Sequence, residues 1–105
     1  MDDDVLGGVG DRVLFENERV RIWELRLEPG ERGARHQHAF DHVLVSIAGD
    51  RMALQPDPAS AGPFTQYLEG DIAPGQVTFV ARGGIETAVN VGHAPFHEII
   101  VELKD

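Results

Sequence analysis

Residues 30–49 read GERGARHQHAFDHVLVSIAG and hold three of the five histidines, His36, His38 and His42. Side chains alternate between the two faces of a strand, so His36 and His38 point to the same side. His42 lies an even number of positions further on and rejoins them if the bend between keeps the parity. Neutral imidazoles arranged in this way can share one metal ion at about 2.0–2.1 Å. The stretch therefore predicts a metal-binding cluster, and solvated or packing histidines are the alternative.

The composition limits the classes of function that are open to the chain. Its 105 residues are enough for one domain with a single core. A net charge of −9, with nine scattered Lys and Arg residues, argues against nucleic acid or an anionic membrane as a partner. The chain has no cysteine, so a bound metal would need ligands from His, carboxylate groups and water.

The N-terminal segment, MDDDVLGGVGD, is acidic and rich in glycine. We predict that residues 1–12 form a loose arm, because this composition buries little, and that residues 13–105 form the domain. The segment lacks an apolar core of signal-peptide length, and no run of residues is long and apolar enough to span a membrane. The sequence therefore predicts a cytoplasmic protein.

Short runs of strand-forming residues alternate with turn residues along the rest of the chain. Trp23, Leu25 and Leu27 alternate with charged residues, which predicts a strand over residues 19–27 with one buried face. We expect residues 42–47 and 51–55 to form a hairpin around Ala48-Gly49-Asp50. Further strands are predicted at residues 13–15, 64–68, 77–80, 86–91 and 96–103.

Turn residues mark the ends of these strands. Glu69-Gly70-Asp71 is predicted to be a turn, and PDPASAGP at residues 56–63 must be an irregular loop because its prolines cannot donate ladder hydrogen bonds. No segment has sustained helical periodicity, so the sequence predicts an all-β sandwich or barrel. The expected inward-facing residues are Leu44, Leu54, Val77, Phe79 and Ile100 or their register neighbours.

Two spaced sets of residues resemble the motifs of the cupin family. Gly30, His36, His38, His42 and Gly49 have the spacing of the first cupin motif, and the second is matched by Gly75, Ala81, Gly83, Glu86 and Asn90. Residues 13–103 therefore resemble a small single-domain cupin of the cupin 2 conserved-barrel type, which implies a double-stranded jelly roll. Residues 17–30 and the ending Glu102-Leu103-Lys104 are also similar to one-domain cupins named for β-alanine degradation.

The chain departs from the cupin pattern at two ligand positions. His42 stands where the first motif has glutamate, and Glu86 stands where the second has histidine. The resemblance implies that His36, His38, His42 and Glu86 bind one divalent ion, which could be iron, manganese, nickel or zinc. The alternative is a site that no longer binds metal, with His42 and Glu86 bonded to each other or to water.

Two functions remain open on these residues. The first is a metal-dependent enzyme, an oxygenase, isomerase or lyase, that acts on a small polar metabolite bearing a carboxylate. The second is a non-catalytic module that binds a metal or small ligand for sensing or storage. Candidates for holding a substrate, by strand parity alone, are Arg26, Arg51, Gln55 and Tyr67. We further expect a homodimer that pairs exposed edge strands and covers apolar residues such as Trp23.

Overall fold

The computed structural model describes residues 6–104, which form nine β-strands and no helix. No part of these residues could cross a membrane as a helix. The strands are β1 (Arg12–Glu16), β2 (Val20–Leu27), β3 (His36–Gln37), β4 (His42–Ala48), β5 (Arg51–Pro56), β6 (Leu68–Asp71), β7 (Val77–Val80), β8 (Ile85–Asn90) and β9 (Phe96–Leu103).

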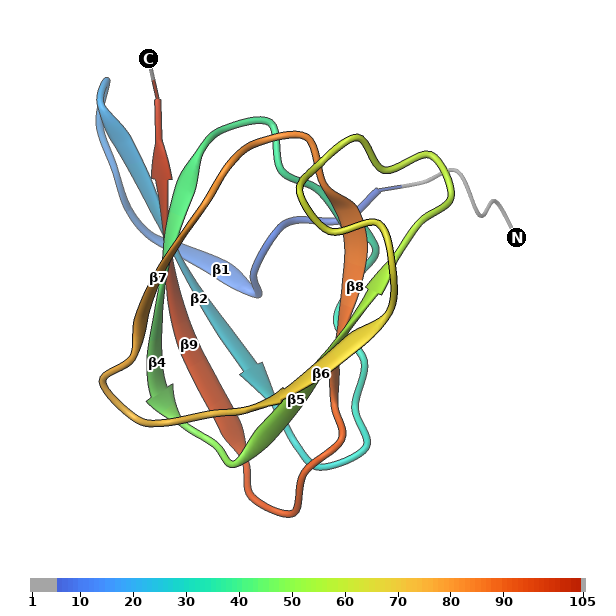
Figure 1. The fold of residues 1–105 in the computed structure, drawn as a ribbon. Helices are drawn as coiled ribbons and strands as arrows, with labels where there is room; N and C mark the ends of the chain where they lie inside the picture. The colour runs from blue at the N-terminus through green and yellow to red at the C-terminus, as the bar shows by residue number, and fades with distance from the viewer. Residues whose placement is uncertain (1–5, 105) are drawn as a thin grey trace.

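The strands form two antiparallel sheets that face each other as the walls of a barrel (Figure 1). Sheet A has the strand order β1-β2-β9-β4-β7, and sheet B has the order β3-β8-β5-β6. The prediction of an all-β barrel is confirmed. Of the loop predicted at residues 56–63, residues 57–63 lie outside the strands, and Pro56 is the last residue of β5.

The hydrophobic core lies on the inward face of sheet A. Leu25 and Leu27 of β2 are buried there, beside Phe96 and Ile100 of β9, which confirms that β2 has one buried face. Burial of apolar surface contributes about 25 cal/mol per Å², so this shared face fixes the register of the two longest strands. In that register Leu27 faces Phe96, and Trp23 faces Ile100.

The inward-facing residues of β7 are the register neighbours of Val77 and Phe79, which the prediction left open. Val77 and Phe79 are 64% and 62% exposed, whereas Val80 is buried and Thr78 lines the interior. The run Val77-Thr78-Phe79-Val80 is apolar at both parities, so its own pattern could not choose a face. Pairing with β4 chooses it, because Val80 lies opposite the inward-facing His42.

The predicted hairpin of residues 42–47 and 51–55 does not form. β4 belongs to sheet A and pairs with β7 and β9, while β5 belongs to sheet B and pairs with β6 and β8. The turn at Gly49 and Asp50 therefore carries the chain from one sheet to the other. Asp50 stabilises this crossing, because its carboxylate accepts hydrogen bonds from the backbone N–H groups of Arg51 and His93.

The strand predicted at residues 64–68 begins later than its alternation suggested. β6 runs from Leu68 to Asp71 and includes the residues predicted as a turn. Pairing with β5 sets these limits, with Leu68 opposite Leu54 and Asp71 opposite Arg51. Arg51 donates hydrogen bonds to Glu69 and Asp71, so charged side chains across the pair support a strand over residues with weak strand propensity.

The boundary between an arm at residues 1–12 and a domain at residues 13–105 stays a prediction. Residues 1–5 and 105 lie outside the described residues. Within the described part of the arm, Val9 is buried in the core, and the N–H of Gly7 donates to the carbonyl of Arg35 at 2.7 Å.

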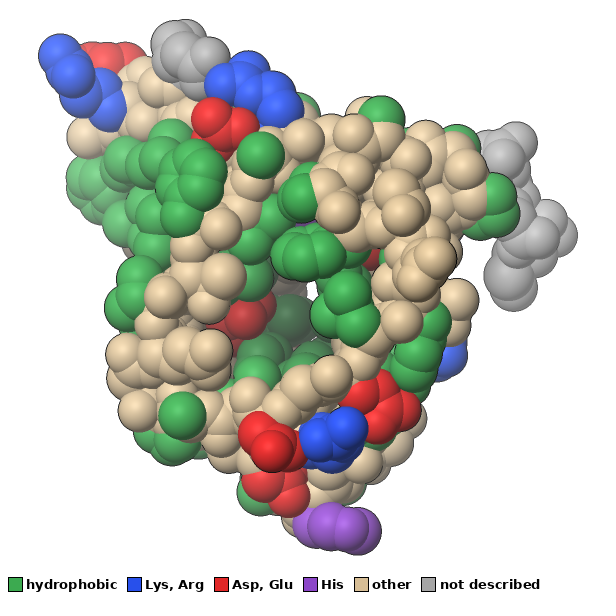
Figure 2. All heavy atoms as spheres, in the orientation of Figure 1, with side chains coloured by type: hydrophobic (Ala, Val, Ile, Leu, Met, Phe, Trp, Pro, Cys, Tyr) green, Lys and Arg blue, Asp and Glu red, His purple; other side chains and the backbone are tan. Residues whose placement is uncertain are grey.

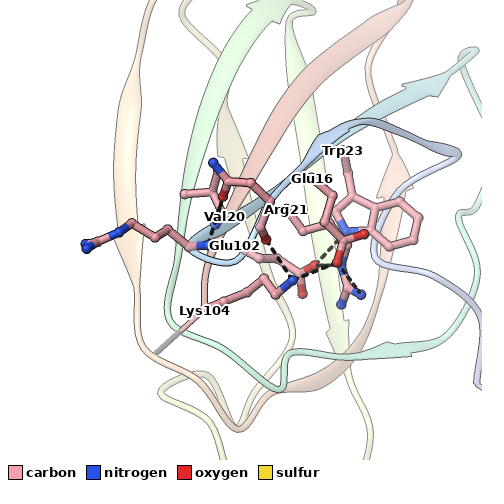
Figure 3. Close-up of polar contacts among 8 residues, drawn as sticks. Glu16, Val20, Arg21, Trp23, Glu102 and Lys104 are labelled. Carbon is pink, nitrogen blue, oxygen red and sulfur yellow. Dashed lines mark hydrogen bonds and ion pairs between the residues drawn. The ribbon is translucent and has the colours of Figure 1, made fainter.

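A buried carboxylate joins β9 to β2 at one end of sheet A. Glu102 is 2% exposed and accepts hydrogen bonds from Arg21 Nε at 2.7 Å and from Trp23 Nε1 at 2.6 Å. Figure 3 shows these side chains pointing toward one another, with Lys104 and Glu16 paired nearby. The hydrogen bond to Glu102 therefore fixes the indole of Trp23 within the fold.

Candidate metal centre

Short segments of both cupin-like motifs bring three candidate metal ligands together at β3 and β8. His36 of β3 lies directly opposite Glu86 of β8. His38 follows β3, and its backbone is held by two hydrogen bonds, from its N–H to the Gly84 carbonyl and from the Gly83 N–H to its own carbonyl, both 2.8 Å. Gly83 has a φ of +111°, which favours glycine at this turn.

The three side chains converge on one point. His36 Nε2 and His38 Nε2 are 3.1 Å apart, His38 Nε2 is 3.2 Å from Glu86 Oε2, and His36 Nε2 is 3.8 Å from the same oxygen. Ligands about 2.1 Å from a shared ion, at angles between 90° and 110°, would be about 3.0–3.4 Å apart. Two of the three observed separations, 3.1 and 3.2 Å, fall in this range, and the third, 3.8 Å, lies above it.

The orientation of His36 and the space beside Glu86 fit a metal as well. A carbonyl only accepts, so the Nδ1 of His36, 2.9 Å from the Ala34 carbonyl, carries a proton, and Nε2, which faces His38 and Glu86, is the ring nitrogen that could bind an ion. A Cβ at Gly84 would lie 2.7 Å from Glu86 Oε1, so the glycine leaves room for the carboxylate. These residues fit a divalent cation.

The electrostatics of the cluster favour an ionised Glu86 carboxylate. Burial opposes the ionisation of Glu86, but its interactions with His36 and His38 outweigh burial and lower the pKa of this carboxyl to about 2. Glu86 therefore supplies a negative charge to the site. The Nδ1 of His38 is buried without a hydrogen-bond partner among the described residues, which leaves the tautomer of this ring free to adapt to an ion at Nε2.

His42 lies beside this cluster and is not one of the three residues whose ligand atoms all fall within 4.8 Å. Its ring stacks on that of His38 with centroids 3.7 Å apart and planes 12° from parallel. Its Nδ1–H donates to the Phe40 carbonyl at 3.0 Å. Burial, followed by the nearby His38, lowers the pKa of His42, so this ring is held neutral. The fourth ligand of the sequence-based set stays a prediction.

A cavity of about 230 Å³ adjoins the three ligands. Figure 2 looks into its opening, which hydrophobic side chains surround for the most part. The cavity is smaller than the 300–1,000 Å³ of most ligand sites, so it suits a small molecule. Both sheets contribute to its walls, and among its polar side chains are Ser46, Gln76, Thr78 and Glu98.

The side chains that the sequence suggested as substrate anchors do not line this cavity. Arg51 pairs with Glu69 and Asp71, and Tyr67 donates to Glu69. Gln55 is exposed, and Arg26 faces the outside of sheet A beside Glu24. No Lys or Arg is among the described residues that form the cavity walls.

Glu98 is the cavity residue that the sequence reasoning missed. It shares its parity with Phe96 and Ile100, whose apolar side chains mark the buried face of residues 96–103. A strict period of two over this strand would have placed a carboxyl inside the barrel.

Comparison with known proteins identifies the fold. No protein-family model matches the chain, and no curated protein matches it either. Among solved structures, a cupin domain from Bordetella pertussis is similar with a TM-score of 0.77 and 22% identity, covering 90% of this chain and 91% of that one.

Two further solved structures agree. An RmlC-like cupin with a double-stranded β-helix fold from Methanocaldococcus jannaschii is similar with a TM-score of 0.66 and 16% identity, covering 93% of this chain and 94% of that one. A cupin 2 conserved-barrel protein from Salinispora arenicola has a TM-score of 0.61 and 18% identity, covering 86% and 71%. The chain thus has the fold of a small cupin domain, a double-stranded β-helix.

Proposed function

We propose that this cupin domain is a metal-dependent enzyme that binds one divalent ion through His36, His38 and Glu86. The observation that carries the proposal is the convergence of three buried ligand atoms within 4.8 Å beside a cavity. Buried titratable groups gathered at a cavity are the arrangement in which active sites are most often found.

The donor set limits the ions and the chemistry. Two imidazoles and one carboxylate are the ligands preferred by iron(II) in oxygenases, and manganese, nickel and zinc accept the same donors. A divalent ion would supply Lewis-acid or redox chemistry to a ligand bound next to it. The residues of the chain hold its position, because His36 is fixed by the Ala34 carbonyl and Glu86 brings one negative charge.

The cavity walls narrow the class of substrate. A divalent ion with one carboxylate ligand has a net charge of about +1. No Lys or Arg is among the described residues that line the cavity, so no other cation there competes with the ion for an anion. A carboxylate on the substrate would therefore bind at the ion. Leucines, Phe96 and Ile100 are prominent in the rest of the cavity wall, so the body of the substrate is expected to be apolar. We infer a small carboxylate-bearing metabolite in this orientation.

Metal analysis of protein purified without added metal, followed by titration of iron(II), manganese, nickel and zinc by calorimetry, tests the proposal. We expect one ion per chain. His38→Ala and Glu86→Gln should each weaken binding by more than about a hundredfold, because loss of a residue that merely orients a ligand already costs 10–100-fold. His93→Ala is the matched control, since that histidine is exposed and outside the cluster.

A screen of small carboxylic acids against the loaded protein would then look for turnover. Binding of an ion without turnover would favour the non-catalytic binding module. If no divalent ion bound, or if all variants bound like the parent, the metal site itself would be disproved.

A further inference from the structure

Glu98 enters the barrel from the wall opposite two of the metal ligands. It lies on β9 in sheet A, whereas His36 and Glu86 belong to sheet B. Its neighbours across the strands are Leu25 of β2 and Ser46 of β4, and Phe96 and Ile100 flank it on the same face. Glu98 and the ligands line one cavity, so a molecule bound beside the ion would have the Glu98 carboxyl facing it from the other sheet.

The surroundings of this carboxyl contain no positive partner. Within residues 6–104, no side chain or backbone group forms a hydrogen bond or ion pair with it. Its strand neighbours Leu25 and Ser46 do not titrate. The other titratable residues that line the cavity are His36, His38, Asp71 and Glu86, and the same face of the adjoining strands and of β9 also carries His42 and the ion pair of Arg21 with Glu102.

An ionised carboxylate in this position would be costly. Burial, with a smaller contribution from the charge of Glu86, raises the pKa of Glu98 to about 8. At neutral pH the side chain is therefore a carboxylic acid with one O–H donor. A leucine or methionine would fill the same space without the free-energy cost of removing a polar group from water. Packing alone therefore does not explain a carboxylic acid that faces the cavity without a hydrogen-bond partner.

We propose that Glu98 contacts the bound ligand and donates its O–H to a neutral acceptor oxygen at the end of the molecule remote from the ion. This inference rests on the proposed function, since the ion defines which end of the ligand lies near His36, His38 and Glu86. Glu98 thereby determines specificity. It favours a ketone or similar oxygen over a methyl group, and it disfavours a second carboxylate, for which the described cavity walls hold no cation.

Three probes that share one head group test the assignment on the zinc-loaded protein. Pentanoate, 4-oxopentanoate and pentanedioate each present a carboxylate to the ion and differ at the far end, which is apolar, a neutral acceptor or an anion. At pH 6.5 we expect 4-oxopentanoate to bind about three- to tenfold more tightly than pentanoate, the range of one neutral hydrogen bond, and pentanedioate to bind most weakly.

The pH dependence and two variants separate a hydrogen bond from simple fit. At pH 9 the parent should lose the preference for 4-oxopentanoate, because Glu98 is then ionised and has no proton to donate. Glu98→Gln should keep the preference at both pH values, since its amide N–H donates throughout, and Glu98→Leu should lack it at both. Circular dichroism of each variant checks that it is folded.

Failure of the Glu98 inference can be distinguished experimentally from failure of metal binding. Should zinc fail to bind, the proposed function falls, and the protonation of Glu98 is tested on its own by infrared spectroscopy. Infrared spectra of the metal-free protein should show a protonated carboxyl at pH 6.5 that is absent in Glu98→Gln and disappears by pH 9. Equal affinities for the probes, no binding of any probe, or an ionised Glu98 at pH 6.5 would overturn the inference.

Discussion

At the scale of single residues, the three clustered histidines differ in what their ring nitrogens face. His36 and His38 direct Nε2 toward Glu86, whereas the ring of His42 stacks on His38 and is tied to the Phe40 carbonyl. We expect His42→Ala to reduce affinity for a divalent ion by about 10–100-fold, which is less than the loss in His38→Ala, because stacking supports the position of His38 without supplying a ligand atom. Calorimetry against His38→Ala measures this. Equal losses in the two variants would instead make His42 the fourth ligand.

Glu98 also makes the stability of the domain depend on pH. Its pKa is about 8 in the folded protein and about 4.5 in an unfolded chain. Between these values the folded state holds the extra proton, so the contribution of Glu98 to the free energy of unfolding falls as pH rises from about 4.5 to about 8. Below about pH 4.5 both states are protonated and the penalty is absent.

Glu98→Gln should therefore gain thermal stability over the parent as pH rises. We expect its melting temperature to exceed that of the parent by at least about 4–8 °C at pH 8, the shift that 1 kcal/mol produces in a domain of this size, and by much less at pH 4.5. Thermal denaturation of both metal-free proteins across this range measures the difference. A constant difference at all pH values would show that Glu98 is not the titrating group.

The sequence predicted which residue types gather in the candidate site, but it did not predict the direction of each side chain. Parity along a strand was enough to group His36 with His38, and the spacing of the second motif pointed to Glu86. Whether His42 joins them depends on the direction of its ring, which the Phe40 carbonyl fixes and which no spacing encodes. Glu98 escaped notice because it belongs to neither motif.

At the scale of secondary structure elements, the limits of most strands were predictable from the sequence, whereas the partners of each strand were not. β9 matches its predicted limits, residues 96–103, and β2 differs by one residue at its start. The partners of β4 and β5 could not be read from the turn between them. The sheet to which each strand belongs is decided by contacts with β8 and β9, which lie far along the chain.

One buried side chain holds the loop between the last two strands. Asn90 is 1% exposed, its Nδ2 donates to the carbonyls of Leu27 and Ala94, and its Oδ1 accepts from the N–H of Gly92. Asn90→Ala would leave these buried groups without partners, at a cost of about 1–3 kcal/mol for each group left unsatisfied.

We expect Asn90→Ala to lower the free energy of unfolding by about 2 kcal/mol or more, measured by urea denaturation. Asn17→Ala is the matched control. The side chain of Asn17 accepts two backbone hydrogen bonds in an exposed turn, where water can replace it, so its loss should be about 1 kcal/mol or less. Similar losses in the two variants would mean that burial does not set the contribution of Asn90.

At the scale of the whole molecule, the outward face of sheet A is unusually apolar. Phe15, Val77 and Phe79 are more than half exposed, and half-buried aliphatic side chains continue the face across the sheet at Val43, Val45, Ile99 and Val101. Hydrophobic side chains gather over these strands at the left of Figure 2. Monomeric proteins seldom expose a contiguous apolar surface of more than a few hundred Å².

We expect this face and the edge strand β7 to join two copies of the chain in a symmetric dimer. In a two-fold interface the same surface patch of each copy contacts that of the other, so the apolar face of one copy can cover the apolar face of its partner. Val77 and Phe79 would lie within this interface. The parent should sediment as a dimer at tens of micromolar. The double variant Val77→Lys, Phe79→Lys should be monomeric, because each copy would bring two charges into the contact. Val91→Lys, which follows β8 of sheet B, should leave the dimer intact. A monomeric parent, or a double variant that still sediments as a dimer, would show that this face does not join two copies.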